Sequence, residues 1–187
     1  MPSPLRITAV AGSLRAESLN RRLLDELVVA LHAAGADVDV LDLRSEHLPM
    51  YDADLQARDG LPRFALDAHD RIARSDAFVA VNPEYNGSFP AVFKNFIDWV
   101  SRADMLLLHP RLVGLASATP GGKAGRRGLE HTRDLFANMF VDVHTDLLGV
   151  GHAAEVFGDD ALLADLRSSL ERWAGGFVEA ARTKRQA

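Results

Sequence analysis

Polar side chains suited to binding an anion follow the first apolar run of the sequence. The run 5–10 is followed by a segment that supplies two hydroxyl groups, one guanidinium and one carboxamide: Ser13, Ser18, Arg15 and Asn20. A helical pattern begins at Leu19, and the free N–H groups at the start of a helix attract anions. An arginine fork also matches phosphate oxygens. We therefore predict a phosphate site here; the alternative is that Ser18 only caps the helix.

The same segment differs from three familiar loops. A P-loop needs Gly-Lys followed by Ser or Thr, and the chain contains no such tripeptide. The Gly-x-Gly-x-x-Gly dinucleotide motif is absent after the first apolar run. Ser13 also lacks the flanking glycines of a Gly-x-Ser-x-Gly nucleophile turn. The segment therefore fits a terminal phosphate better than a pyrophosphate or a nucleoside triphosphate.

Two further polar loops each follow an apolar run. The loop 82–90 contains two prolines and a glycine, which fix its backbone, and we expect it to present N–H groups and Tyr85 to a flat partner. A tight turn that caps the next helix through Ser88 would also explain it, and Glu84 could alternatively be a hydrolytic carboxylate. The loop 117–122 has little side-chain bulk, so a ring could approach its backbone, although it could equally be an ordinary flexible loop.

Alternating strand and helix patterns separate these loops. Apolar and β-branched runs predict strands at 5–10, 36–43, 76–81, 112–116 and within 141–150. Apolar residues recurring every three or four positions predict helices at 19–35, 61–72, 90–100, 129–140 and 162–177. We expect 49–60 to be an exposed loop and the tail 182–187 to fray. The alternation predicts an α/β fold, a five-stranded parallel sheet with helices on both faces, in one domain spanning 1–187.

Composition excludes several classes of protein. The 187 residues are 48% hydrophobic and 25% charged, which is typical of a globular protein rather than a disordered one. The net charge of −5 gives no broad field for nucleic acid or an anionic membrane. Absence of cysteine excludes disulfides and thiolate chemistry. The apolar runs are too short to span a membrane and 1–6 lacks the features of a signal peptide, so we expect a cytoplasmic protein.

Three motifs in order resemble the NADPH-dependent FMN reductase family of flavodoxin-like proteins, which includes soluble quinone, azo-dye and chromate reductases. They are Gly12-Ser13-Leu14-Arg15-x-x-Ser18-x-Asn20, Pro83-Glu84-Tyr85-Asn86-Gly87-Ser88-x-Pro90 and Lys94-Asn95-x-x-Asp98-Trp99. The resemblance extends from the first strand to about Gly128, and it implies a flavodoxin-like fold. The family often has Lys where this chain has His109 before Pro110, a departure that lies away from the three loops.

The resemblance also implies a cofactor and its ligands. The FMN phosphate would be held by Ser13, Arg15, Ser18 and Asn20, and the isoalloxazine would be lined by Pro83, Glu84, Tyr85, Asn86 and Gly87. The other side of the flavin would be closed by Ser117, Gly121 and Gly122. The implied activity is that of an NAD(P)H oxidoreductase with NADPH or NADH as donor and a small acceptor such as a quinone. Because the flavin carries the chemistry, no catalytic side chain is assigned.

Other functions and other residues remain open at this point. A flavodoxin-like electron carrier that does not oxidise NAD(P)H is the main alternative, and a hydrolase using Glu84 or Ser13 is a third. Seven scattered histidines show no metal-ligand spacing, so no metal site is expected. We interpret residues 52 and 54 as solvated loop residues and 159–160 as a helix cap. A contact of 126–127 with the phosphate of a nicotinamide cofactor is left open. The aromatic helix 90–102 resembles the family's interface segment and favours a homodimer or homotetramer.

Overall fold

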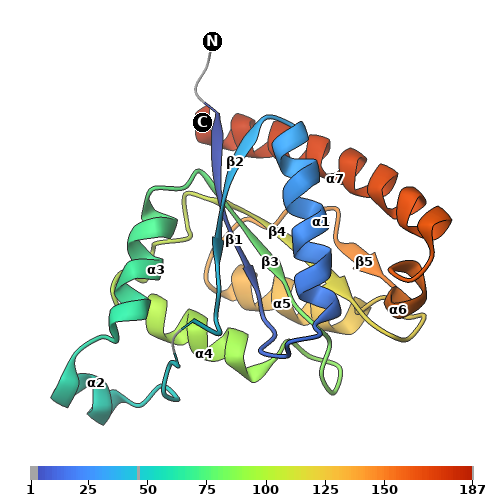
Figure 1. Ribbon diagram of the computed structural model, residues 1–187. Coiled ribbons are helices and arrows are strands. Elements are labelled where there is room, and N and C mark those ends of the chain that lie inside the picture. Colours follow the sequence, from blue (N-terminus) through green and yellow to red (C-terminus); the bar gives the residue numbers. More distant parts are fainter. Residues whose placement is uncertain (1–3, 46, 187) are drawn as a thin grey trace.

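One parallel sheet forms the centre of the molecule. The computed structural model describes residues 4–45 and 47–186. Residues 1–3, which belong to the segment expected to lack the features of a signal peptide, lie outside the described part. The strands are β1 (Leu5–Ala11), β2 (Ala36–Leu41), β3 (Ala77–Val81), β4 (Leu112–Ala118) and β5 (Leu148–Val150). They pair in the order β2-β1-β3-β4-β5 (Figure 1). This order is that of flavodoxin-like proteins, which confirms the predicted fold class.

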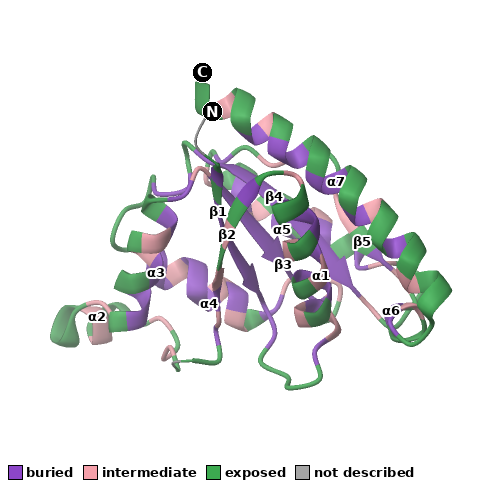
Figure 2. Cartoon of the chain, turned by 45° about the horizontal axis from the view of Figure 1, so that its top comes forward, coloured by how far each residue is buried: buried purple, intermediate pink, exposed green. Residues whose placement is uncertain are grey.

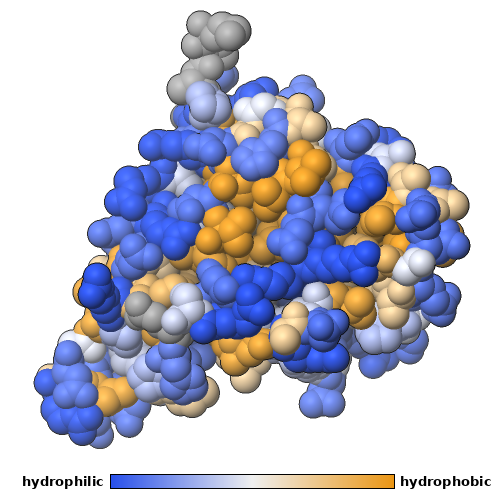
Figure 3. Space-filling model, viewed as in Figure 1, coloured by the Kyte–Doolittle hydropathy of each residue, from blue (hydrophilic) through white to orange (hydrophobic). Residues whose placement is uncertain are grey.

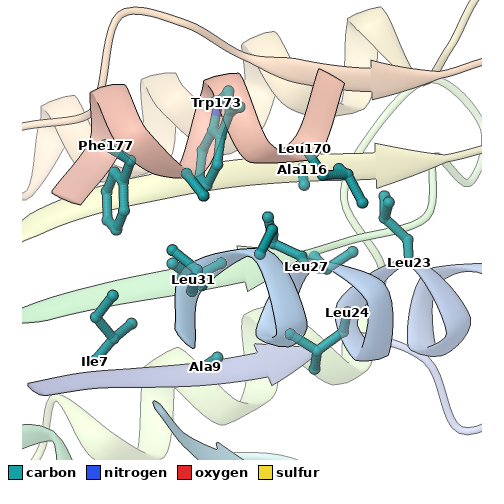
Figure 4. Close-up of a cluster of buried hydrophobic side chains, with 14 of the residues drawn as sticks. Ile7, Ala9, Leu23, Leu24, Leu27, Leu31, Ala116, Leu170, Trp173 and Phe177 are labelled. Carbon is teal, nitrogen blue, oxygen red and sulfur yellow. The ribbon is translucent and has the colours of Figure 1, made fainter. Parts of the chain in front are cut away.

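Helices cover both faces of the sheet. One face packs against α1 (Leu19–Ala33), α6 (Ala153–Val156) and α7 (Asp160–Gln186), and the other against α3 (Arg63–Ala73), α4 (Ala91–Val100) and α5 (Arg126–Asn138). On the first face, leucines of α1 lie opposite Leu170, Trp173 and Phe177 of α7 (Figure 4). Full burial of such a side chain contributes about 1.5–3 kcal/mol. Because both faces are covered, every residue of β3 and β4 is buried (Figure 2).

The aromatic stripe of α4 belongs to the core of its own chain. Phe93, Phe96 and Trp99 are fully buried, and the two phenylalanines pack with Phe136 of α5 or Phe64 of α3. Phe93 and Phe96 therefore point into the core beside the sheet, and Trp99 packs against Tyr51 in the segment after β2. A subunit interface, if there is one, must use other side chains.

We predicted that 49–60 is an exposed loop. The prediction is wrong in part, because the segment contains α2 (Ala53–Asp59). Asp52 caps this helix by accepting a hydrogen bond from the Asp54 N–H at 2.8 Å. None of its side chains is buried, and hydrophilic side chains cover most of it (Figure 3). A helix held by its cap and not by an apolar stripe gives no periodic signal, which is why the pattern missed it.

The prediction that the tail frays is wrong up to residue 186, where α7 ends; Ala187 lies outside the described residues. Arg182 donates to the Gly35 carbonyl at 3.1 Å, and Lys184 and Arg185 form ion pairs with Asp142 and Asp76. These contacts with distant segments hold the last turn. The expected cap at the other end is confirmed, since Asp159 accepts from two N–H groups of the first turn of α7.

The remaining boundaries differ from the prediction by a few residues. α5 begins at Arg126, three residues earlier than expected, and the fifth strand occupies only Leu148–Val150 of the expected range. The short α6 was not predicted. Within the described part of the chain, no helix is long and apolar enough to cross a membrane.

Candidate functional site

The three polar loops meet at the carboxyl ends of β1, β3 and β4. The Gly12 N–H donates to the Val81 carbonyl at 3.0 Å, and the Asn82 N–H donates to the Ala116 carbonyl at 2.9 Å, so all three loops start at one level. The chain runs outward in opposite directions from β1 and β3, which makes this point the topological switch of the sheet. Ligands of open α/β sheets bind at such a point.

The first loop places its polar groups around the start of α1. Ser13 and Ser18 are buried, whereas Arg15 is exposed. Ser18 is the N-cap of α1, and its hydroxyl accepts from the Arg21 N–H at 3.3 Å. The alternative reading of Ser18 as a cap is therefore confirmed, although a capping hydroxyl retains a hydrogen to donate. Arg15 remains free to meet an anion at this helix start.

Asn20 connects two of the loops. Its carboxamide nitrogen donates to the Ala118 carbonyl at 2.8 Å, and its oxygen accepts from the Ala118 N–H at 2.9 Å. We predicted a contact with phosphate, but the structure directs both polar atoms to the end of β4. Asn20 thus fixes the start of α1 against the third loop and positions the groups that surround it.

The second loop contains a two-residue hairpin turn. The Tyr85 N–H donates to the Ser88 carbonyl at 2.9 Å, and the Ser88 N–H donates back at 3.0 Å. Asn86 and Gly87 have φ values of 52° and 77°, the left-handed conformation that Asn-Gly turns favour. The tight turn is confirmed, but Ser88 closes the hairpin and does not cap α4, whose N-cap is Pro90. The half-exposed Tyr85 ring stands at its edge.

Glu84 joins the second loop to α5. Its carboxylate accepts from the Gly128 N–H at 3.0 Å, in the first turn of that helix. A side chain at Gly128 would lie 3.1 Å from the Glu84 Cβ, so the glycine permits the close approach. Capping of a helix from another loop gives Glu84 a structural role.

The third loop contains one buried hydroxyl group and two exposed glycines. Ser117 is 1% exposed, and its hydroxyl has no hydrogen-bond partner among the described residues. A Cβ at Gly125 would lie 2.1 Å from that hydroxyl, and Gly125 has a φ of 69°, so only glycine fits there. Gly121 and Gly122 are exposed, and nothing lies within 4 Å of a Cβ at Gly121. A flat ring could approach this backbone closely, as expected.

The sequence interpretation missed Asn82 at the end of β3. The residue is 4% exposed, and neither polar atom of its carboxamide has a hydrogen-bond partner within the described chain. Its oxygen lies 2.0 Å from where a Cβ on Gly12 would stand, so the carboxamide fills the space beneath the first loop. Unsatisfied buried polar groups are rare in native proteins and call for an explanation. A polar residue at the end of a wholly apolar strand was the available signal.

The third motif anchors the edge of the site. The Asn95 carboxamide accepts from the Tyr51 N–H at 2.8 Å, and it donates to the Pro49 carbonyl at 2.9 Å. The Trp99 N–H donates to the same carbonyl at 2.7 Å. These bonds hold the segment after β2 against α4. The motif residues therefore shape the neighbourhood of the loops and do not enter it.

The carboxylate of Asp42, which follows β2, has a displaced pKa. Partial burial raises its pKa. The hydrogen bonds from Arg44 and the charge of Arg21 together lower the pKa by more than burial raises it, so the net pKa is below the ordinary value. Arg21 in α1 lies 2.7 Å from Asp42. This ion pair joins the start of α1 to the end of β2.

Other residues considered from the sequence lie elsewhere. His109 lines a cavity at the amino ends of the strands, which confirms that it lies away from the loops. His144 packs against Trp173 and Phe177 in the core. Over residues 4–45 and 47–186, no three His, Asp or Glu side chains gather in a group that could hold a metal ion.

Solved structures share this fold. FerB, a flavoenzyme NAD(P)H:(acceptor) oxidoreductase from Paracoccus denitrificans, matches with a TM-score of 0.76 at 24% identity, over 95% of this chain and 98% of that one. The azoreductase AzrA matches with a TM-score of 0.67 at 19% identity, over 92% of this chain and all of that one (100%). At such identities the likeness concerns the fold.

Sequence relatives extend the likeness to family. A quinone reductase of Escherichia coli is 32% identical over 145 residues, which cover 76% of this chain and 73% of that protein. An NAD(P)H-dependent FMN reductase of Pseudomonas aeruginosa is 30% identical over 144 residues, 77% of this chain and 75% of that protein. The family model of NADPH-dependent FMN reductases matches residues 5–155, a range that contains all three polar loops. With the switch-point site and the flavodoxin-like sheet, this match establishes that the chain belongs to the NADPH-dependent FMN reductase family.

Proposed function

We propose that this protein is an FMN-dependent NAD(P)H oxidoreductase, a single domain over 1–187 that passes electrons through bound FMN to a small acceptor such as a quinone. The observation that carries the proposal is the meeting of three polar loops at the β1/β3 switch point, with Arg15 exposed at the start of α1. The phosphate site expected from the residues and the family membership agree on the same ligand. A cytoplasmic location forms part of the proposal, because the donor is a metabolite of the cell interior.

The first loop would hold the phosphate of FMN. Arg15 supplies a charged fork, and the hydroxyls of Ser13 and Ser18 can donate to phosphate oxygens. The N-terminus of α1 adds its positive end of the helix dipole. Asn20 keeps this loop in register with β4, so its contribution to binding is positional.

The second and third loops would border the isoalloxazine. Pro83–Gly87 present a hairpin backbone fixed by paired hydrogen bonds. Gly121 has open space beside its backbone, whereas the His152 ring lies beside Gly122, with Nε2 2.8 Å from where a Cβ would stand. The buried carboxamide of Asn82 and hydroxyl of Ser117 have no hydrogen-bond partner within 4–45 and 47–186. They lie beneath these loops and fit a polar ligand or its ordered water. When bound, FMN supplies a group that takes up hydride from a reduced nicotinamide and releases electrons to an acceptor. The chain binds and orients the reactants, and no side-chain acid or base is assigned.

Three measurements test the proposal. The purified protein should be yellow or become so with FMN, and titration calorimetry should give one FMN per chain and much weaker binding of riboflavin. Equal affinity for FMN and riboflavin would contradict the phosphate assignment. A yellow protein that does not oxidise NADPH in the presence of a quinone would instead be an electron carrier.

Steady-state kinetics test whether one open site serves both reactants. The chain has no second nucleotide motif, so donor and acceptor would occupy the same place in turn. Double-reciprocal plots of NADPH oxidation at several quinone concentrations should give parallel lines. Intersecting lines would mean that both reactants bind together.

We also propose that the protein forms a homodimer. The supporting observation is a set of exposed apolar side chains near the ends of α4 and α5: Met105, Leu106 and Phe140. Phe140 is 80% exposed, and large exposed apolar groups of this kind mark interaction surfaces. Sedimentation equilibrium at micromolar concentration should give twice the chain mass, and a monomer there would refute the dimer.

A further inference from the structure

Positive charge gathers around the start of α5 in a way that disfavours the helix itself. Lys123 precedes the helix, Arg126 and Arg127 open it, and its first turn contains no acidic residue. Cations at a helix N-terminus oppose the helix dipole. Gly125 offers no side chain as a cap, and the carboxylate of Glu84 bonds only the third N–H of the helix. An anionic ligand would offset this arrangement.

Little of this charge is neutralised by the protein. The Arg126 Nε donates to Glu130 at 2.9 Å, which leaves the terminal nitrogens of an arginine that is 83% exposed. Lys123 and Arg127 are exposed and form no ion pair with another described residue. The whole chain carries a net charge of −5, so a local excess of cations stands against the general balance.

Arg127 connects this charge to the candidate flavin site. Its Cδ lies 3.7 Å from where a Cβ on Gly87 would stand, so the side chain runs along the Asn86–Gly87 turn. Arg126 is the next residue back, and successive residues of a helix point about 100° apart. Arg126 therefore projects in another direction, away from the hairpin.

The other direction contains a groove of about 440 Å³ between α5 and the edge strand β5. Lys123 and Arg126 line it together with the apolar side chains of Leu129 and Leu147, the carboxylate of Glu130 and the hydroxyl of Thr145. Gly149 of β5 allows the loop to pack closely, because a Cβ there would lie 2.5 Å from the Ala124 carbonyl oxygen. A site with apolar side chains, two cations and a single carboxylate that bonds only the Nε of Arg126 is suited to a flat base carrying a phosphate.

We propose that this groove receives the adenosine half of the nicotinamide donor, with Lys123 and Arg126 binding the 2′-phosphate and Arg127 binding the diphosphate. The proposal rests on the function proposed above. Along the protein surface, the hairpin is followed by Arg127 and then by the groove. Along the donor, the nicotinamide is followed by the diphosphate and then by the adenosine, so the two orders match. Because only NADPH carries the 2′-phosphate, the pair Lys123 and Arg126 selects NADPH over NADH.

The test uses donor fragments that lack nicotinamide, so that binding is measured without turnover. Titration calorimetry of the FMN-loaded protein should show 2′-phospho-ADP-ribose binding about 10- to 150-fold tighter than ADP-ribose, the range expected for hydrogen bonds to a charged group. The double variant Lys123→Gln/Arg126→Gln should bind the two fragments equally. Arg127→Gln should weaken both by a similar factor. Arg133→Gln, an exposed arginine two turns along α5, is the matched control and should change neither.

Steady-state rates separate this inference from the proposed function. The double variant should raise the KM for NADPH and leave kcat, the KM for NADH and the FMN content unchanged. Equal binding of both fragments by the unmodified protein, or a preference that survives in the double variant, would overturn the inference even if NADPH is oxidised. Selective fragment binding by a protein that oxidises neither donor would support the groove and contradict the proposed function.

Discussion

The two ends of the sheet differ in how their polar groups are satisfied. At the amino ends of β3 and β4, a cavity of about 480 Å³ is lined by Asp76, Arg111, Lys184 and Arg185 among others. Arg111 is buried and donates to four backbone carbonyl groups, and the other two cations pair with Asp76 and Asp142. Burial lowers the pKa of Arg111. The chain itself uses the hydrogen-bonding capacity of these groups.

The carboxyl end shows the opposite pattern. Asn82 and Ser117 are buried without partners in the described chain, and Arg15 is exposed at a helix start. Unsatisfied polar groups are costly, so they persist where a ligand or bound water satisfies them. Unpaired polar groups therefore locate a site better than cavity volume does, because the cavity at the amino end leaves little hydrogen-bonding capacity for a ligand.

The largest expected effect is at the amino end, where Arg111→Met should lower the free energy of unfolding by at least about 3 kcal/mol. The substitution leaves several carbonyl groups without a donor, and each unsatisfied buried group costs about 1–3 kcal/mol. Urea unfolding measures the loss, and Arg111→Lys, which keeps a charge, should lose less. The FMN dissociation constant should not change. A variant with normal stability and weakened FMN binding would break the distinction between the two ends.

The reverse outcome is expected for Arg15→Ala at the carboxyl end. FMN affinity should fall about 10- to 150-fold because a hydrogen bond to a charged group is lost. The free energy of unfolding of the flavin-free protein should stay within about 0.5 kcal/mol, as for exposed residues generally. Fluorescence titration with FMN and riboflavin gives the readout, and riboflavin binding should be unaffected. An FMN change of less than about threefold would make Arg15 an ordinary surface residue.

A pair of buried asparagines sharpens the comparison. Asn82→Leu should raise the stability of the flavin-free protein by about 1 kcal/mol, since an unpaired buried polar group is removed, and it should weaken FMN binding several-fold. Asn95→Leu is the matched control: its carboxamide is fully engaged with the backbone at 49–51, so stability should fall by about 1–3 kcal/mol. Thermal melting and FMN titration follow both. Destabilisation by Asn82→Leu with unchanged FMN affinity would show that Asn82 serves the fold alone.

The smallest effect concerns pH at the amino end. The hydrogen bond and the charge of Lys184 hold the pKa of Asp142 below its ordinary value of 3.8. A lowered pKa in the folded state stabilises the protein above the unfolded pKa, and this contribution disappears as pH falls through the folded value. Lys184→Gln should therefore cost less than about 1 kcal/mol at pH 7 and nothing in strong acid. Urea unfolding across pH measures the difference, and a constant cost at all pH values would refute the assignment.

Local sequence determined the strands, most helices and the tight turn of the second loop. Apolar strands such as β3 and helices with a buried stripe such as α3 carry their signal within a few residues. The dipeptide Asn86-Gly87 likewise determines its turn from local sequence alone, because the turn needs only residues that accept a positive φ. The three motifs, two in the loops and one in α4, were sufficient to indicate the family, which the match over 5–155 establishes.

Tertiary structure decided how the parts of the site face one another. Asn20 bonds Ala118 across 98 positions and Glu84 bonds Gly128 across 44, and no local pattern encodes either partner. The same holds for the last turn of α7, which ends in ion pairs with Asp76 and Asp142. Hydrophobic periodicity reports which face of an element is buried, whereas a side-chain hydrogen bond depends on the position of a distant backbone group to within a few tenths of an ångström. The sequence by itself therefore determined the type and order of the elements, and only their packing decided which polar residues position the site and which remain free for a ligand.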